Sequence, residues 1–239
     1  MRLLFIRHGQ SVNNLLYDQT GCSNGRNEDP ELSPVGKKQV KALAKFLKSS
    51  KLPKKVVSGA GFYLNDFSIT HLYTSLMVRA VSTAEPVAEV LGLPLYSDMD
   101  LHEGGGIYQE EETGEKRGLP GKTRSFFQQH FPRLIIPDGV SESGWWNKPF
   151  EEEGERVVRA TRLLTRILEK HLNSEDCVAF FSHGEFYNIF LSVLLGLQWR
   201  NQFWFLLNNC GISRIDFDKD DSRFVYFNRT DHLPINMIT

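Results

Sequence analysis

The chain has 239 residues and a net charge of −1, and this balance does not indicate nucleic acid or an anionic membrane surface as a partner. No apolar run reaches the length needed to cross a membrane. Its length suits one large domain over residues 1–239, with a core of its own. Its three cysteines, Cys22, Cys177 and Cys210, lack any CxxC spacing, which favours a reducing, cytoplasmic compartment over a disulfide framework or a zinc site.

Short apolar runs rich in β-formers alternate with amphipathic helical patterns along most of the chain. In the first part, the predicted order is a strand at residues 3–6, a polar loop at 13–31, a helix starting at Ser33 and Pro34, a surface excursion at 50–65, a strand at 68–73, a helix capped by Thr74 and Ser75, and an edge strand at 93–96. The second helix carries Arg79, and we expect it to bend or restart at Pro86, which has no backbone N–H.

The last third of the chain continues the alternation. The predicted order is a helix at residues 151–172, a strand at 177–181, a helix at 186–195, and a hairpin of strands at 212–217 and 224–227. Strands that alternate with helices over most of a chain predict the α/β class. We expect a three-layer α/β/α sandwich around a mostly parallel central sheet.

Residues 104–150 interrupt the alternation with frequent Gly and Pro. A loop region of this length is usually a lid or a binding element, so we expect an inserted segment that sets substrate specificity. Within it, Arg117, Lys122 and Arg124 either meet a second anionic group on the substrate or form a solvated basic face. We expect the pair Trp145-Trp146 to anchor the segment on the core rather than to stack on a substrate.

Two histidines follow strands of the predicted sheet. Arg7-His8-Gly9 comes directly after the first strand, and Ser182-His183-Gly184 comes after the strand at residues 177–181. In open α/β sheets ligands bind beyond the carboxyl ends of the strands. The two histidines are therefore expected to face each other over one ligand.

An arginine next to one histidine indicates phosphate chemistry. A histidine nucleophile must be neutral, and a nearby guanidinium disfavours the imidazolium while its planar fork binds phosphate oxygens. Arg7 suits this purpose, and Arg79 and His183 are candidates for further stabilisation of the transferring phosphoryl group. The leaving oxygen needs a proton, for which Glu103, after a short apolar segment, is the candidate.

Arg7-His8-Gly9-Gln10-Ser11 resembles the R-H-G-x-[ST] motif of the histidine phosphatase superfamily, which includes cofactor-dependent phosphoglycerate mutases. Further segments resemble other motifs of that family in the same order, over about residues 2–217. They are Asn14, Thr20-Gly21, Leu32-Ser33-Pro34-Val35-Gly36 with Gln39, Tyr73-Thr74-Ser75-Leu76-Met77-Val78-Arg79-Ala80, Leu101-His102-Glu103, Ser182-His183-Gly184 and Asn209-Cys210-Gly211.

The resemblance implies an enzyme in which His8 accepts the phosphoryl group and Glu103 protonates the leaving alcohol and then helps to activate water. It also implies that the phosphate is bound by Arg7, Asn14, Thr20, Arg79, His183 and Gly184. No metal and no cofactor are implied, because the arginines and the second histidine supply the positive charge. The remaining histidines, His71, His130, His171 and His232, match no family motif, and we expect no catalytic role for them.

The segment after Glu103 departs from the family's mutases. They follow their glutamate with a Tyr-Gly and basic pattern that holds the substrate carboxylate, whereas this chain has Gly104-Gly105-Gly106-Ile107-Tyr108 and an acidic run. We therefore favour a phosphomonoesterase acting on a small phosphorylated metabolite. The alternatives are a phosphoglycerate-mutase-type transfer, a phosphoprotein phosphatase and an inactive binding scaffold. The sequence predicts neither the natural substrate nor the oligomeric state.

Overall fold

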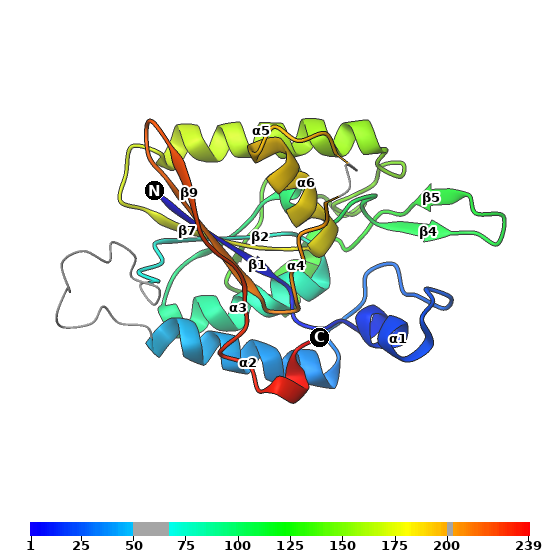
Figure 1. Ribbon diagram of the computed structural model, residues 1–239. Helices are drawn as coiled ribbons and strands as arrows, with labels where there is room; N and C mark the ends of the chain where they lie inside the picture. The colour runs from blue at the N-terminus through cyan, green and yellow to red at the C-terminus, as the bar shows by residue number, and fades with distance from the viewer. Residues whose placement is uncertain (50–66, 200–202) are drawn as a thin grey trace.

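A computed structural model describes residues 1–49, 67–199 and 203–239 (Figure 1). Seven of the described strands form one sheet in the order β6-β3-β2-β7-β1-β8-β9. The first five strands of this order run parallel, and β8 and β9 are antiparallel to their neighbours. The strands are β1 (Arg2–Arg7), β2 (His71–Thr74), β3 (Leu95–Ser97), β6 (Leu134–Ile135), β7 (Cys177–Ser182), β8 (Ile212–Phe217) and β9 (Ser222–Arg229).

Helices cover both faces of this sheet. The helices α2 (Pro34–Ser49) and α3 (Val78–Leu91) lie on one face, and α5 (Glu153–His171) and α6 (Gly184–Leu194) lie on the other (Figure 1). Side chains of β1 alternate between the two cores: Leu4 and Ile6 pack toward α2 and α3, whereas Leu3 and Phe5 pack toward α5 and α6. The predicted three-layer α/β/α sandwich with a mostly parallel sheet is confirmed.

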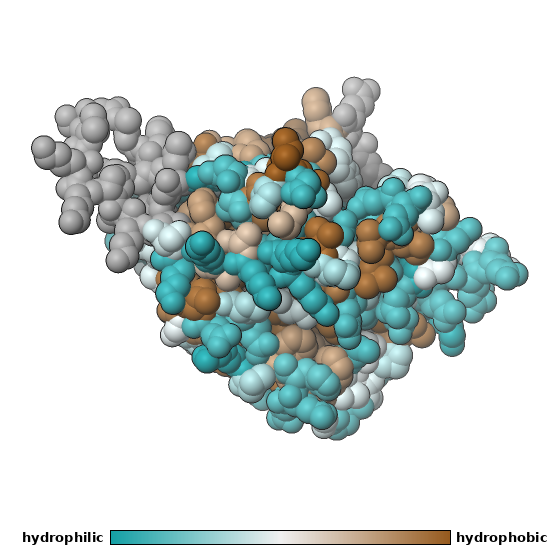
Figure 2. Space-filling view, turned by 90° about the horizontal axis from the view of Figure 1, so that it is seen from below, coloured by the Kyte–Doolittle hydropathy of each residue, from teal (hydrophilic) through white to brown (hydrophobic). Residues whose placement is uncertain are grey.

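The outer surface over α2 is mostly hydrophilic, with scattered apolar residues (Figure 2). This agrees with the amphipathic pattern of α2, which buries Val40, Leu43 and Leu47 and turns its lysines outward. In the parts of the chain that the structure describes, we find no helix with both the length and the apolar composition needed to cross a lipid bilayer.

The register of the central strands brings the two histidines to one edge of the sheet. Arg7 is paired with Ser182 at the carboxyl ends of β1 and β7, so His8 and His183 leave the sheet side by side. On the other side of β7, Thr74 of β2 is paired with Phe181. The chain therefore enters α3, with Arg79 in its first turn, at the same edge.

Residues 104–150 are anchored more extensively than a simple loop. Strands β4 (Tyr108–Glu110) and β5 (Lys116–Gly118) form a hairpin that projects from the body of the molecule (Figure 1). The rest of the segment contributes helix α4 (Arg124–His130) and strand β6, which extends the central sheet. Trp145 and Trp146 are buried in the core, so the expected anchoring role of this pair is confirmed.

One expected loop and one expected helix restart are wrong. Part of the polar loop expected at residues 13–31 is helix α1 (Val12–Thr20), which Ser11 caps through the backbone N–H of Asn14. The described side chains of α1 include none that is buried, so its sequence lacks the apolar stripe that usually identifies a helix. Helix α3 continues through Pro86 to Leu91, because Val87 and Ala88 after the proline are fully buried in the core.

Smaller corrections concern a cap and an edge. Met77, rather than Thr74 or Ser75, is the N-cap residue of α3. The strand expected at the edge of the sheet, β3, is covered by β6. The surface excursion expected at residues 50–65 lies outside the described residues. Two short 3-10 helices, η1 (Met99–Leu101) and η2 (Ile235–Met237), complete the described elements.

Candidate active site

A cavity of about 240 Å³ opens at the edge of the sheet where β1 ends, and we call it the His8 cavity. Residues expected to act on phosphate line it together, although they come from β1, α1, α3 and the segment after η1. Its lining consists of Arg7, His8, Ser11, Asn13, Asn14, Leu16, Tyr17, Ser23, Arg26, Pro30, Arg79 and Glu103.

The hydrogen bonds of His8 fix which ring nitrogen carries the proton. Nδ1 lies 2.7 Å from the carbonyl oxygen of Gly9, which can only accept, so Nδ1 donates. Nε2 accepts a hydrogen bond of 3.2 Å from Nε of Arg79, since a guanidinium can only donate. The lone pair of His8 is therefore on Nε2, the atom beside Arg79.

The surroundings of His8 also keep its ring neutral. The ring is buried, and burial is the main cause that lowers the pKa of His8 well below its usual value. The positive charges of Arg79 and Arg7 lower this pKa further, because they repel the imidazolium form. At neutral pH the lone pair on Nε2 is thus available to attack an electrophile.

Arg79 lies near a buried carboxylate, that of Asp29, which the sequence analysis did not identify. Oδ1 of Asp29 lies 3.9 Å from Nη1 of Arg79 and accepts a 3.0 Å hydrogen bond from the backbone N–H of Val78 at the start of α3. Burial raises the pKa of Asp29 to about 6, although Arg79 opposes this effect. Asp29 stands in a polar stretch far from Arg79 in the sequence, so no local pattern indicated this contact.

Two nitrogen atoms beside His8 are buried without a hydrogen-bond partner among the described residues, namely Nε of Arg7 and Nδ1 of His183. The other contacts of these side chains are made: Nη1 of Arg7 donates to the carbonyl of Leu207, and Nε2 of His183 lies 2.9 Å from Oγ of Ser75. Buried polar atoms are nearly always paired, and Arg7 lines the cavity, so its Nε is a candidate donor to an anionic ligand there.

His183 stands behind His8 rather than on the cavity wall. The two ring centroids are 5.1 Å apart, and His183 is fully buried. Burial, followed by the charge of Arg79, lowers the pKa of His183 well below its usual value. Gly184 follows at the start of α6, where a Cβ atom would lie 3.5 Å from Nε of Arg7.

Glu103 lines the cavity and caps α6. Its Oε1 accepts hydrogen bonds from the backbone N–H groups of Phe186 and Gly104, at 2.9 and 3.1 Å. Its Oε2 accepts a longer bond of 3.4 Å from the N–H of Glu185. These donors fix the orientation of the carboxyl group at the helix N-terminus, beside the cavity that also contains Nε2 of His8.

Asn14 lies in the cavity, whereas Thr20 does not. Oδ1 of Asn14 accepts hydrogen bonds from the backbone and the hydroxyl of Ser11 and from Nδ2 of Asn209, which leaves its amide nitrogen to donate to a ligand. Thr20 is the last residue of α1, and its exposed hydroxyl donates to the carbonyl of Leu16 one turn earlier. Thr20 does not line the His8 cavity, and its expected approach to phosphate stays a prediction.

The three basic residues expected to set specificity do not line the His8 cavity. Arg117 is on the projecting hairpin, with its side chain 63% exposed and 3.8 Å from Glu111. The ammonium of Lys122 lies 5.1 Å from the ring of Phe126, and Arg124 starts α4. Their proposed role in binding a second anionic group stays a prediction.

Arg26 is a basic residue that does line the His8 cavity, unlike Arg117, Lys122 and Arg124. It lines the cavity, its guanidinium lies 4.4 Å from the ring centroid of Tyr108, and Nη1 donates a 2.6 Å hydrogen bond to the Tyr108 hydroxyl. This contact joins the loop after α1 to the β4–β5 hairpin. No local pattern indicated this contact, since Arg26 is an isolated basic residue between Gly25 and Asn27.

Asn209 supports the nucleophile from the opposite end of the chain. Its Nδ2 donates to the carbonyl of His8 at 2.9 Å as well as to Oδ1 of Asn14. The same side chain accepts a hydrogen bond from the hydroxyl of Thr239. The turn Asn209-Cys210-Gly211, one of the segments that resemble the family, therefore fixes both His8 and Asn14.

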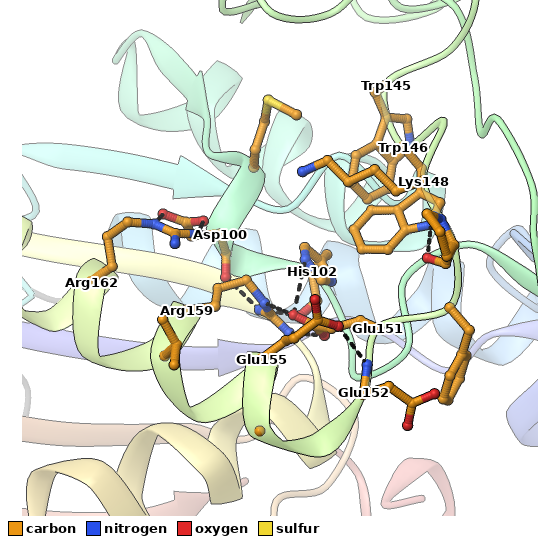
Figure 3. Close-up of a pocket in the computed structure, with 15 residues that line it drawn as sticks. Asp100, His102, Trp145, Trp146, Lys148, Glu151, Glu152, Glu155, Arg159 and Arg162 are labelled. Carbon is orange, nitrogen blue, oxygen red and sulfur yellow. Dashed lines mark hydrogen bonds and ion pairs between the residues drawn. The ribbon is translucent and has the colours of Figure 1, made fainter.

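A larger cavity of about 610 Å³ lies beside His102, the residue before Glu103 (Figure 3). Its lining includes His102, Trp146 and Glu151, and none of the residues expected to bind phosphate. On its wall, Arg159 forms two hydrogen bonds with Glu151 and donates to the carbonyl of His102. These contacts hold the backbone that positions Glu103, so we assign this cavity a structural role.

Comparisons with known proteins show which family the sequence matches. The family model described as histidine phosphatase superfamily (branch 1) matches residues 3–61 and 55–230. Among curated proteins, putative phosphoserine phosphatase 2 of Hydrogenobacter thermophilus is 27% identical over 97% of each chain. Probable phosphoglycerate mutase GpmB of Yersinia enterocolitica is also 27% identical, over 92% of this chain and 86% of its own.

Solved structures show the same fold. Phosphoserine phosphatase from Entamoeba histolytica, in complex with 3-phosphoglyceric acid, is 21% identical and covers 98% of this chain and 99% of its own, with a TM-score of 0.59. A putative alpha-ribazole-5'-P phosphatase from Escherichia coli has a TM-score of 0.62 at 19% identity, with 96% of both chains covered. With the family model matching nearly the whole length, this chain belongs to branch 1 of the histidine phosphatase superfamily.

Proposed function

We propose that this chain hydrolyses phosphomonoesters through a phosphohistidine formed on Nε2 of His8. The observation that carries the proposal is the protonation of His8. The carbonyl of Gly9 holds the proton on Nδ1, and Nε of Arg79 donates a hydrogen bond to the lone pair on Nε2. The unpartnered nitrogens of Arg7 and His183 beside this ring supply the donors that a phosphoryl group needs. Membership of the family and the phosphatase names of relatives support the same reaction.

In the first half-reaction, the lone pair on Nε2 of His8 attacks phosphorus, and the bond from phosphorus to the ester oxygen breaks. Arg7, Arg79 and His183 stabilise the charge on the phosphoryl oxygens. Glu103 gives a proton to the departing alkoxide, which leaves as the alcohol. The products of this step are a phosphohistidine and the ionised carboxylate of Glu103.

In the second half-reaction, water attacks the phosphorus atom while the carboxylate of Glu103 takes up one of its protons. The bond from phosphorus to Nε2 breaks, and its electron pair returns to the ring of His8. Inorganic phosphate leaves, and both residues regain their starting protonation states. The guanidinium groups of Arg7 and Arg79 provide the positive charge in both steps, so the scheme needs no metal ion.

The substrate that we propose is a small phosphorylated metabolite with a second anionic group. A cavity of about 240 Å³ admits a phosphate and a short carbon skeleton. Arg26 lines the same cavity and offers a planar guanidinium that suits a carboxylate. Relatives named for phosphoserine and phosphoglycerate, both of which carry a carboxylate, support this class of substrate.

A mutase-type transfer is the second candidate, because other relatives are named probable phosphoglycerate mutases. A mutase must retain its product and keep water from the phosphohistidine. Hydrolysis is favoured by the glycine-rich segment after Glu103, which lacks the basic pattern of the mutases. A phosphoprotein substrate, an inactive scaffold and a cytoplasmic location stay predictions of the sequence analysis.

The experiment that tests the function measures phosphate release from a panel of phosphorylated metabolites and phosphopeptides. We expect the protein to release phosphate from small carboxylated phosphomonoesters. In His8→Ala, turnover should fall to below a few per cent of that of the unsubstituted protein, and no phosphoenzyme should form. His130→Ala, which changes an exposed histidine on α4, is the matched control and should keep full activity. Transfer between positions of phosphoglycerate without release of phosphate would instead establish the mutase.

A further inference from the structure

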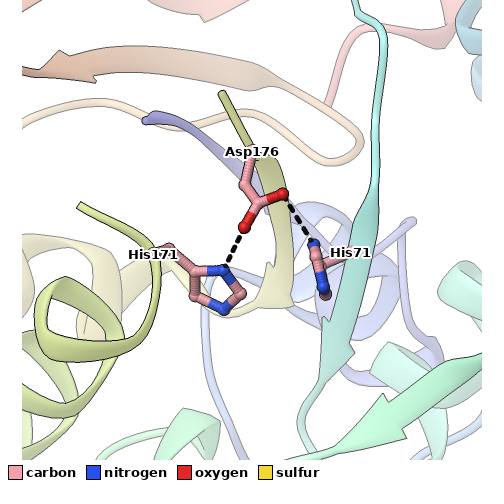
Figure 4. A group of neighbouring side chains, drawn as sticks. All are labelled: His71, His171 and Asp176. Carbon is pink, nitrogen blue, oxygen red and sulfur yellow. Dashed lines mark hydrogen bonds and ion pairs between the residues drawn. The ribbon is translucent and has the colours of Figure 1, made fainter. Parts of the chain in front are cut away.

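Two histidines and an aspartate that the proposed function does not use converge at the opposite edge of the sheet (Figure 4). His71 begins β2, His171 ends α5, and Asp176 precedes β7. Both strands start at this edge and end at the edge of the His8 cavity, so the group is remote from the catalytic residues. We call these three residues the His71 cluster.

The side chains of the His71 cluster point at one another (Figure 4). One ligand atom from each residue can be chosen so that all three lie within 4.8 Å of one another. Nδ1 of His171 lies 2.8 Å from Oδ2 of Asp176, and Nδ1 of His71 lies 3.6 Å from Oδ1 of the same carboxylate. Ligand atoms of a tetrahedral zinc site are about 3.3 Å apart, a separation that lies between these two distances.

A second set of contacts orients the cluster. Nε2 of His171, on the far side of its ring, lies 3.1 Å from the hydroxyl of Tyr73, which leaves Nδ1 directed at Asp176. Metal-binding histidines characteristically make such a hydrogen bond with their second nitrogen. The hydroxyl of Thr70, 2.9 Å from Nδ1 of His71, can donate instead to the carbonyl of Cys177 when His71 binds a metal.

The cluster is accessible from solvent on one side. The side chains of His71 and Asp176 are 31% and 24% exposed, whereas that of His171 is 1% exposed. An ion can therefore enter past His71 and keep a water molecule as a further ligand.

We propose that His71, His171 and Asp176 bind a zinc ion, with water as the fourth ligand. Two imidazoles and one carboxylate are ligands of the type that Zn²⁺ takes in open tetrahedral sites. The spacing of the cysteines argues against a zinc site with thiolate ligands, and the proposed site contains no cysteine. It does not depend on the proposed phosphatase reaction.

A metal bound there would connect the first residue of β2, the last residue of α5 and the residue before β7. Its expected effect is on stability, because it binds the folded arrangement of three segments that are far apart in the sequence. These strands lead to Ser75 and His183 at their other ends. We nevertheless expect turnover to be unchanged by the metal, since the His71 cluster lies at the opposite edge of the sheet.

The test titrates metal-free protein with Zn²⁺ against a fluorescent zinc chelator and follows thermal unfolding in parallel. We expect one equivalent to bind and Tm to rise by about 5 °C at a hundredfold excess over Kd. His71→Ala and the isosteric Asp176→Asn should each weaken binding at least tenfold and remove the rise in Tm. His130→Ala, at an exposed histidine outside the cluster, should bind as the unsubstituted protein does.

A further variant separates the proposed site from the His8 cavity, which is lined by His8 and has His183 behind it. His8→Ala should bind Zn²⁺ with unchanged affinity. Loss of binding in His8→Ala, with normal binding in His71→Ala, would place the ion in the catalytic cavity and overturn the proposal. Absence of binding tighter than millimolar in the unsubstituted protein, or equal affinity in Asp176→Asn, would overturn it as well.

Discussion

The reactivity of His8 depends on two hydrogen bonds of opposite direction. Gly9 accepts from Nδ1 and Arg79 donates to Nε2, so the ring is held in one tautomer before any substrate arrives. The second bond occupies the lone pair that must attack phosphorus. Arg79 must therefore turn its donors from the ring to the phosphoryl oxygens when substrate binds, and its distant contact with Asp29, at 3.9 Å, leaves it room to do so.

Among substitutions of single site residues, Glu103→Gln is the most informative. Glutamine retains the shape and can accept the backbone hydrogen bonds from α6, but it cannot give a proton to the leaving group. We expect kcat/KM for alkyl phosphates to fall by about 10²–10³-fold, and kcat/KM for aryl phosphates with good leaving groups to fall by less than about 10-fold. Because kcat/KM reports the steps up to formation of the phosphohistidine, later activation of water does not obscure the comparison.

The matched control is Glu89→Gln, which removes the same charge from an exposed position on α3 and should leave both rates unchanged. Equal losses of kcat/KM for alkyl and aryl phosphates in Glu103→Gln would show that Glu103 positions the substrate and does not protonate the leaving group.

The residues that the sequence predicted are those that stand inside compact motifs. Arg7, His8 and Arg79 lie where the structure brings them together, because each follows directly from a strand end or a helix start. Asp29 and Arg26 were missed, because each acts through a contact with a distant segment and neither stands in a recognisable local pattern. Thr20 lies on a helix that was predicted as a loop, and its contact with phosphate stays a prediction.

Among the elements, the start of α2 packs directly on the strand end that carries the nucleophile. A Cβ atom on Gly36 would lie 2.1 Å from the carbonyl oxygen of Gln10, which is backbone and cannot move independently. Gln39 of the same helix accepts a hydrogen bond from the N–H of Gln10. The glycine therefore allows α2 to approach the segment that positions His8.

We expect Gly36→Ala to lower the free energy of unfolding by about 1–3 kcal/mol and to reduce kcat, because the backbone after His8 must shift to admit the methyl group. Gly154→Ala is the matched control in α5, since a Cβ at Gly154 would meet nothing within 4 Å, and we expect it to be neutral or to stabilise by up to about 1 kcal/mol. Urea unfolding of both variants, with activity assays, checks this. Equal stability of the two would mean that the contact with Gln10 relaxes freely.

The contact between the loop after α1 and the β4–β5 hairpin predicts a specificity effect. Arg26→Ala removes the cavity arginine, so KM for substrates with a carboxylate should rise about 10–100-fold. Substrates without a second anionic group should be affected much less. Arg117→Ala on the same hairpin is the control, because its side chain is exposed and outside the His8 cavity. A rise in KM in Arg117→Ala alone would support the specificity role first expected for the inserted segment.

Elements with an apolar period could be predicted, and elements without one could not. Regularly repeating buried faces indicated the helices α2, α5 and α6, and short apolar runs indicated the strands β1, β2, β3, β7, β8 and β9. Strand β6 has two residues, too few to show any period, and it owes its place to pairing with β3. Helix α1 is set by its cap at Ser11 and not by burial, so the polar composition of its sequence pointed to a loop.

Over the whole molecule, buried neutral histidines make stability depend on pH. The pKa values of His8, His102 and His183 are lowered well below their usual range, in each case mainly by burial. Below about pH 6.5 the unfolded chain takes up a proton on each of these residues and the folded protein does not. Stability should therefore fall with falling pH, by up to about 1.4 kcal/mol per pH unit for each histidine.

Two further groups modify this slope in opposite directions. The pKa of His232 is lowered to about 4, mainly by burial, so this residue also favours the unfolded state between about pH 6.5 and 4. The pKa of Asp29 is raised to about 6, so the folded protein takes up this proton first and gains stability between about pH 6 and 4. Asp29 offsets about one histidine, and the net effect remains a loss of stability in acid.

Urea unfolding at pH 7.5, 6.5, 5.5 and 4.5 measures this loss, provided that the slope of the free energy of unfolding against urea concentration is the same at each pH. His8→Gln removes one titrating group and should make the decline below pH 6.5 shallower by about 1.4 kcal/mol per pH unit. His130→Gln, at an exposed site on α4, should leave the decline unchanged. A stability that is constant or rises from pH 6.5 to 4.5 would show that the buried histidines are charged in the folded protein, and a charged His8 could not act as the nucleophile.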